Sequence, residues 1–134
     1  MAISQITPQG LEGVDATCDN VALGENTLSS VTSGNRNTAI GDDAMCLTTT
    51  GSSNTAIGKN AIKKNVSGNY NTAIGDGALV DNTASNNTAV GYNAMLGNTS
   101  GNQNVAIGYN ALDASTSSSE HTAVGFQALT SNTT

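Results

Sequence analysis

The sequence predicts an all-β fold, a parallel β-solenoid (β-roll) of about seven 17-residue coils that assembles as a homotrimer. A four-residue motif of the type Thr-Ala-Ile-Gly occurs seven times, at spacings of 17, 17, 17, 16, 17 and 17 residues. Asn, Thr, Ser and Gly make up nearly half of the chain, so large apolar residues are too few for an ordinary globular core. Such a chain can fold by stacking similar short units in register, as repeat proteins do.

Each unit holds two short apolar runs. The first run is the motif itself, whose copies begin at Val21, Thr38, Thr55, Thr72, Thr88, Val105 and Thr122. The second run is a pair of residues that begins three residues after each motif glycine. The second member of each pair is large: Leu28, Met45, Ile62, Leu79, Met95, Leu112 and Leu129. Gly and Asn between the runs tolerate tight-turn geometry. We therefore expect two β-strands per coil, each paired with the same run one coil away.

Alternation of side chains along a strand predicts which residues fill the coil. Large residues facing solvent would promote aggregation, so we expect the large members of both runs to point inward. For the first run this column comprises Ile40, Ile57, Ile74, Val90, Ile107 and Val124. The Thr column of the same run would also point inward. The alanines of both runs would form a flat outer surface.

Association along this alanine surface is expected because two apolar columns make a marginal core. Seven coils at about 4.8 Å per strand give a rod only about 33 Å long. A closed three-fold arrangement adds buried surface and prevents runaway stacking. An Asn precedes each motif copy except the last, where His121 stands, and we expect the asparagines to stack as a side-chain amide ladder.

Residues 1–19 do not follow the repeat, and residues 20–134 form the repeat domain. We expect residues 1–19 to be an N-terminal cap or attachment arm, because solenoid ends expose unpaired strand edges. The first residues lack the basic region and apolar stretch of a secretion signal.

Composition disfavours several classes of partner. With a formal net charge of −6 and four basic residues, the chain lacks the basic surface that binds nucleic acid. It also lacks an apolar run of membrane length, so no membrane insertion is expected. Cys18 and Cys46 occupy different repeat positions and are expected to be free thiols.

No enzyme, cofactor or metal site is predicted. His121 is the single histidine, and Glu120 beside it would point to the opposite face of a strand. Asp42 and Asp76 share a turn column with Lys59 between them, which favours a neutralised charge column over a cation site.

The position after the motif glycine holds the candidate binding site. Read along the chain, this column is Glu25, Asp42, Lys59, Asp76, Tyr92, Tyr109 and Phe126. Three of the four aromatic residues would therefore form a stripe with a step of about 5 Å. We predict that Tyr92, Tyr109 and Phe126 contact a sugar or a partner's apolar surface. The alternatives are a self-stacking ladder and a contact between subunits.

The unit Asn-Thr-Ala-Ile-Gly-Asp-Gly-Ala-Leu at residues 71–79 resembles the repeats of phage tail-fibre proteins and of the YadA-like heads of trimeric autotransporter adhesins. The resemblance covers residues 20–129 and implies a trimer of left-handed parallel β-rolls. It also implies a bacteriophage tail fibre or virion appendage that is made in the host cytoplasm. Such a protein would attach to other virion proteins through residues 1–19 and bind a host-surface glycan or protein.

Other roles fit the sequence less well. A spacer or decoration protein of the virion would have the same fold without a ligand, and a head fragment of a bacterial adhesin would share the repeat. A polysaccharide lyase is disfavoured because charged residues are sparse. An ice-binding solenoid is disfavoured because Val21 and Val105 interrupt the Thr column, which is also expected to point inward.

Overall fold

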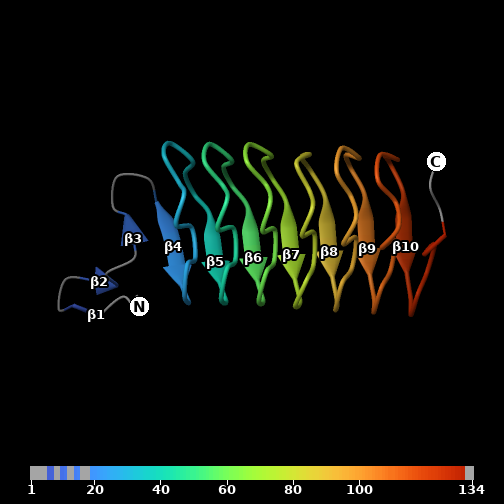
Figure 1. Cartoon of the computed structure of the whole chain (residues 1–134), viewed down its shortest axis with the longest axis horizontal. Coiled ribbons are helices and arrows are strands. Elements are labelled where there is room, and N and C mark those ends of the chain that lie inside the picture. The colour runs from blue at the N-terminus through green and yellow to red at the C-terminus, as the bar shows by residue number, and fades with distance from the viewer. Residues whose placement is uncertain (1–5, 8–9, 12–13, 16–18, 132–134) are drawn as a thin grey trace.

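A computed structural model of the chain describes residues 6–7, 10–11, 14–15 and 19–131, and all regular secondary structure in them is β (Figure 1). Seven parallel strands stack as a β-solenoid of about six turns, which confirms the predicted all-β solenoid, whereas the homotrimer stays a prediction. They are β4 (Asn20–Leu23), β5 (Thr38–Ile40), β6 (Thr55–Ile57), β7 (Thr72–Ile74), β8 (Thr88–Val90), β9 (Val105–Ile107) and β10 (Thr122–Val124).

Three short strands precede the solenoid. β1 (Ile6–Thr7) pairs with β2 (Gly10–Leu11), and β3 (Val14–Asp15) pairs antiparallel with β4. The edge of β4 that faces away from β5 is therefore hydrogen-bonded. The roles of residues 1–19 as a cap or an attachment arm stay predictions.

The strands pair in strict register, each Thr and Ala beside its equivalent in the next coil. The coil between β7 and β8 is one residue shorter, yet Thr72 still pairs with Thr88. The missing residue lies in the longer turn, where Asn71 Nδ2 donates to the Ala84 carbonyl as Asn54 Nδ2 donates to the Gly68 carbonyl. The strand ladder is thereby kept unbroken.

The predicted orientation of the first run was wrong. Its alanines are buried, with 0% exposure at Ala39 and Ala56, whereas Ile57 and Ile74 are 38% and 40% exposed. The residues of the Ile column (Ile40, Ile57, Ile74, Val90, Ile107 and Val124) alternate with these alanines, so they point outward together with the Thr column. The large members of the second pair and buried asparagines occupy the narrow interior. The inner face of each strand therefore has room only for the methyl group of an alanine.

The second pair forms no strand, so each coil contains one strand instead of two. Its large members have positive φ angles, for example 51° at Met45 and 52° at Ile62. In this turn conformation consecutive side chains need not point to opposite sides as they do in a strand, and both Ala44 and Met45 are fully buried. The backbones of these turns still stack, because Met45 N donates to the Ala61 carbonyl at 3.0 Å. The expectation that the Leu/Met column fills the coil is confirmed.

Three polar columns complete the stack. In the predicted Asn column, Asn71 N donates to Asn54 Oδ1 at 2.9 Å, and Asn71 Nδ2 donates to the Ala84 carbonyl at 2.8 Å. These amides therefore bond mainly to backbone groups and seldom to each other. Two further columns escaped prediction, a buried one (Thr48, Asn65, Asn82, Asn98 and Ser115) and an alternating one (Asn35, Ser52, Asn69, Ser85, Asn102 and Ser119).

The motif glycines are required by backbone angle and by space. Gly75 has a φ of 137°, and a Cβ there would lie 2.4 Å from the Gly91 carbonyl oxygen. Gly125 has a φ of 130°, but its Cβ would meet nothing closer than 4.0 Å. We predict that Gly75→Ala lowers the free energy of unfolding by more than the roughly 1–3 kcal/mol of backbone strain expected for Gly125→Ala. Chemical denaturation of both variants measures this, and equal losses would contradict it.

Thr48 makes fewer side-chain hydrogen bonds than the asparagines in its buried column. Its Oγ1 atom is buried and makes no hydrogen bond with the described residues. At the equivalent position, Asn65 Nδ2 donates to the Gly68 carbonyl and Asn65 Oδ1 accepts from Gly68 N, both at 2.8 Å. We predict that Thr48→Asn raises the free energy of unfolding by about 1–2 kcal/mol. The reverse change, Asn65→Thr, should lower it, and a Thr48→Asn variant less stable than the parent would contradict the prediction.

Candidate functional site

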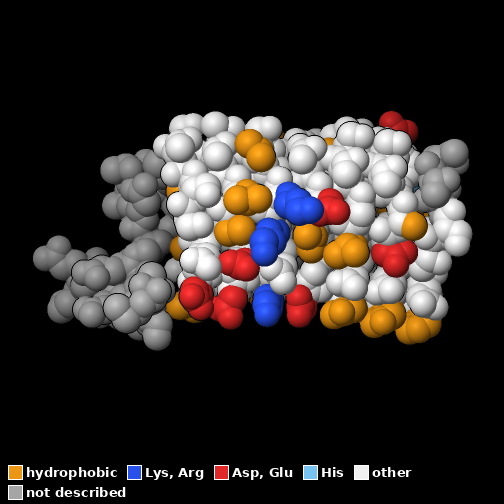
Figure 2. Space-filling view, in the orientation of Figure 1, with side chains coloured by type: hydrophobic (Ala, Val, Ile, Leu, Met, Phe, Trp, Pro, Cys, Tyr) orange, Lys and Arg blue, Asp and Glu red, His pale blue; other side chains and the backbone are white. Residues whose placement is uncertain are grey.

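The aromatic stripe (Tyr92, Tyr109 and Phe126) forms as the sequence predicts. The ring centroids of Tyr92 and Tyr109 are 5.4 Å apart with 13° between their planes, and those of Tyr109 and Phe126 are 5.2 Å apart with 10° between their planes. Their exposed fractions are 50%, 45% and 73% in chain order. Figure 2 shows hydrophobic side chains gathered along this edge of the solenoid.

Glycine turns at the ends of β8, β9 and β10 position the three rings. The turn backbones hydrogen-bond from coil to coil, with Asn110 N donating to the Tyr92 carbonyl at 2.9 Å and Gln127 N to the Tyr109 carbonyl at 2.8 Å. A Cβ at Gly91 would lie 2.5 Å from the Gly108 carbonyl oxygen, so the turns approach too closely for any other residue. Side chains that follow these glycines must therefore project in register.

Stacking limits what the stripe can offer a ligand. Tyr109 has a ring on each side, so its faces are engaged and its edge and hydroxyl remain available. The self-stacking ladder is thus realised in the structure. Contact with a ligand would use ring edges and the two tyrosine hydroxyls more than ring faces.

The N-terminal half of the same edge is charged. Glu25, Asp42, Lys59 and Asp76 continue the column, and Glu25 N donates to Asp42 Oδ1 at 3.3 Å. The column of residues that follow the motif glycines, at the C-terminal ends of the strands, therefore changes from charged after β4–β7 to aromatic after β8–β10 (Figure 2).

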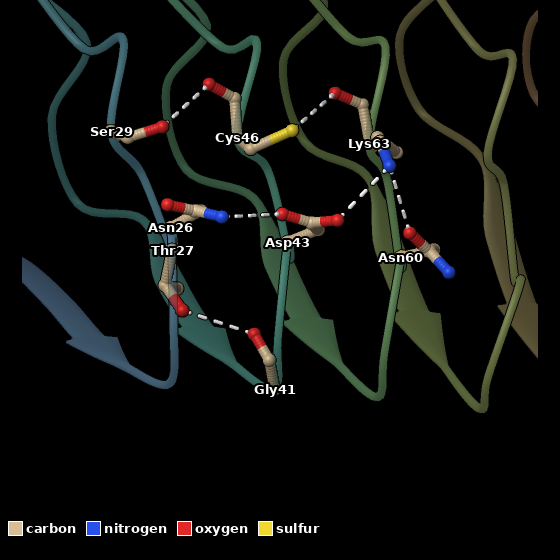
Figure 3. A network of polar contacts seen from close by, with 8 residues as sticks. All are labelled: Asn26, Thr27, Ser29, Gly41, Asp43, Cys46, Asn60 and Lys63. Atoms are coloured by element: carbon tan, nitrogen blue, oxygen red, sulfur yellow. Dashed lines mark hydrogen bonds and ion pairs between the residues drawn. The ribbon is translucent and has the colours of Figure 1, made fainter. Parts of the chain in front are cut away.

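A polar network lies beside the charged half of this edge (Figure 3). Lys63 Nζ donates to Asp43 Oδ2 at 3.1 Å and to Asn60 Oδ1 at 3.0 Å, and Asn26 Nδ2 donates to Asp43 Oδ1 at 3.2 Å. The bond from Lys63 and then that from Asn26 lower the pKa of the Asp43 carboxyl below its ordinary value. Its stabilising contribution is present above that ordinary value and is lost as pH falls through the lowered pKa. This network joins three coils and has a structural role.

Within the part of the chain that the structure describes, the remaining reactive side chains form no assembled centre. Cys46 is a buried free thiol whose pKa is raised by burial and then by Asp43, and Cys18 lies outside the described residues. His121 N donates to Asn104 Oδ1 at 2.9 Å, so His121 occupies the Asn-column position. Among residues 19–131 and the short N-terminal strands, no three metal-ligating side chains cluster and no helix is suited to crossing a membrane.

The outer sheet face is a second candidate surface, which sequence reasoning had placed inside. We use this name for the two outward columns of β4–β10, which are Val21, Thr38, Thr55, Thr72, Thr88, Val105 and Thr122, and Leu23, Ile40, Ile57, Ile74, Val90, Ile107 and Val124. Neither column contains a charged residue. Exposure reaches 47% at Leu23 and 65% at Val124. The complete absence of charge in both columns was the available sequence signal for an apolar outer surface.

Comparisons with known proteins give no relative to guide the assignment. No family model matches the chain, and neither the curated proteins nor the solved structures include a match.

The stacked rings should stabilise the C-terminal coils unequally. Tyr109→Ala removes two ring contacts, whereas Phe126→Ala removes one. At about 0.5–1.5 kcal/mol per aromatic pair, we predict a larger loss of unfolding free energy for Tyr109→Ala. Thermal unfolding followed by circular dichroism compares the two variants, and a smaller loss at Tyr109 would count against stacking.

Proposed function

We propose that the protein is a structural fibre or appendage of a bacteriophage virion, in which three copies associate along the outer sheet face and expose aromatic stripes to a host surface. The observation that carries this proposal is the uncharged, apolar outer sheet face, which runs the length of the solenoid. Monomeric proteins rarely leave a continuous apolar surface of this kind in water.

Self-association along this face suits a thin solenoid. The buried core consists of alanines and one large residue per coil, so little apolar area is removed from water within one chain. Covering the Ile and Thr columns adds burial without desolvating a charge. The association surface thus differs from the alanine surface expected from the sequence, because those alanines are inside.

The repeat resemblance supports the biological setting. The units over residues 20–129 resemble those of tail fibres and YadA-like heads, which favours a left-handed trimer, attachment to the virion through residues 1–19, and binding of a host glycan or protein. Three copies of the stripe on one rod would bind more tightly than one through multivalency. A virion spacer without a ligand and a head fragment of a bacterial adhesin are the competing proposals.

Charges placed on the outer sheet face test the association surface. We predict that Ile57→Lys combined with Ile74→Lys converts the trimer to a monomer, because both side chains would be buried between copies. Val66→Lys is the control, since Val66 is also exposed (46%) but lies on the longer turn. Sedimentation velocity measures both species. A monomeric parent chain, or a double variant that stays trimeric, would contradict the proposal.

Loss of the rings tests host binding separately. We predict that replacing Tyr92, Tyr109 and Phe126 with Ser abolishes retention on an array of immobilised bacterial glycans while the trimer persists. Tyr70→Ser is the matched control, because Tyr70 is 67% exposed and lies outside the stripe. Equal retention of the triple variant and the parent would remove the stripe as a binding site, and the spacer role would then be favoured.

The outward Thr column also favours a second candidate, binding to an ordered surface such as ice. Its hydroxyls repeat at the strand spacing of about 4.8 Å, although Val21 and Val105 interrupt the column. A face buried in a trimer cannot bind ice. Thermal hysteresis shown by a monomeric chain would support this candidate over the fibre.

A further inference from the structure

We propose that copies of this chain lie side by side, pointing the same way and without stagger, so that Arg36 of each copy pairs with Asp42 of the next. The inference rests on the proposed association along the outer sheet face and adds its direction, its register and the residues at its seams.

Two exposed columns border the outer sheet face. The start edge consists of the residues that precede each Asn-column position, namely Asp19, Arg36, Ser53, Tyr70, Asn86, Gln103 and Glu120. All seven have positive φ angles between 53° and 63°, so they project alike from successive coils. The end edge consists of Glu25, Asp42, Lys59, Asp76 and the aromatic stripe.

Arg36 and Asp42 lie at opposite ends of β5 in the same coil. They are six positions apart, with the three-residue strand between them, and no ion pair joins them. The lysine ion pairs of the described residues join Lys63 to Asp43 and Lys64 to Asp81, and Arg36 makes no ion pair among those residues. Its guanidinium is therefore available to a neighbouring copy.

A ring of parallel copies brings unlike edges together. Around an axis parallel to the solenoid, every strand runs in the same rotational sense, so the end edge of one copy meets the start edge of the next at equal height. The second coil then opposes Arg36 to Asp42. In the first coil Asp19 meets Glu25, and Arg36, one strand spacing of about 4.8 Å away, offsets this repulsion.

An antiparallel pair has no such complementarity. With the solenoid axes reversed, the start edges face each other. Asp19 then meets Glu120 beside Arg36, much as it meets Glu25 in the parallel arrangement, but Arg36 itself meets Gln103 and faces no carboxylate. Along the other edge, Asp42 of one copy would lie against Tyr109 of the other. The charge pattern therefore favours the parallel arrangement.

The parallel arrangement also completes the candidate binding site. Each aromatic stripe would lie beside Asn86, Gln103 and Glu120 of the neighbouring copy, which gives a seam lined by rings, amides and a carboxylate. Rings combined with hydrogen-bonding groups suit a hydroxylated ligand such as a saccharide. The site would then be formed by two copies and would be absent from a single chain.

Cross-linking tests the direction and the register. In a background with Cys18→Ser and Cys46→Ala, the pair Arg36→Cys and Asp42→Cys should give covalent trimers with a short bis-maleimide on a denaturing gel. The pair Arg36→Cys and Gln103→Cys should not cross-link, but it would give dimers from an antiparallel assembly. Dimers from the second pair, or no cross-link in a chain that sediments as a trimer, would overturn the inference and leave the proposed function standing. A monomeric parent would instead defeat the proposed function.

Charge reversal tests the pair itself. Asp tolerates the positive φ of residue 36, so Arg36→Asp keeps the fold. With three pairs per ring, Arg36→Asp and Asp42→Arg should each raise the concentration at which trimers dissociate by about tenfold. The double reversal should restore it to near the parent value. A double variant no better than the single ones would overturn the pairing.

Discussion

The constraint on which the structure depends is the close contact between equivalent turns in successive coils. Where the Gly75 Cα approaches the Gly91 carbonyl, there is no room for a Cβ, and the φ angle of 137° excludes most side chains. This contact sets the coil spacing that the strand ladder and the buried asparagines share. The register of every surface column, including the aromatic stripe, follows from it.

A solenoid held in this way obtains much of its stability from hydrogen bonds and little from large apolar groups. Buried asparagines satisfy backbone donors and acceptors that a longer strand would otherwise pair, so one strand of three or four residues per coil is sufficient. With alanine as the inner side chain of the strand, the interior is narrow. The Ile column is consequently directed to the surface, where a second copy can cover it.

The sequence predicted the parts of the fold that depend on period, namely the seven stacked units, the parallel register and the aligned rings. It did not predict the parts that depend on local backbone angle. Met45 and its equivalents have positive φ, so strand alternation does not apply to them, and the rule of placing every large residue inside failed for Ile57. The buried column containing Asn65 and Asn82 was missed because its members differ in type, with Thr48 and Ser115 among them, and lie in turns that are polar throughout.

We propose that copies associate sideways along the outer sheet face. Small-angle X-ray scattering of the full chain measures particle length and mass per unit length independently. Sideways trimers predict three times the mass per unit length of one chain at the length of a single solenoid. A longer particle with the cross-section of one chain, or a particle with the mass of one chain, would contradict the account.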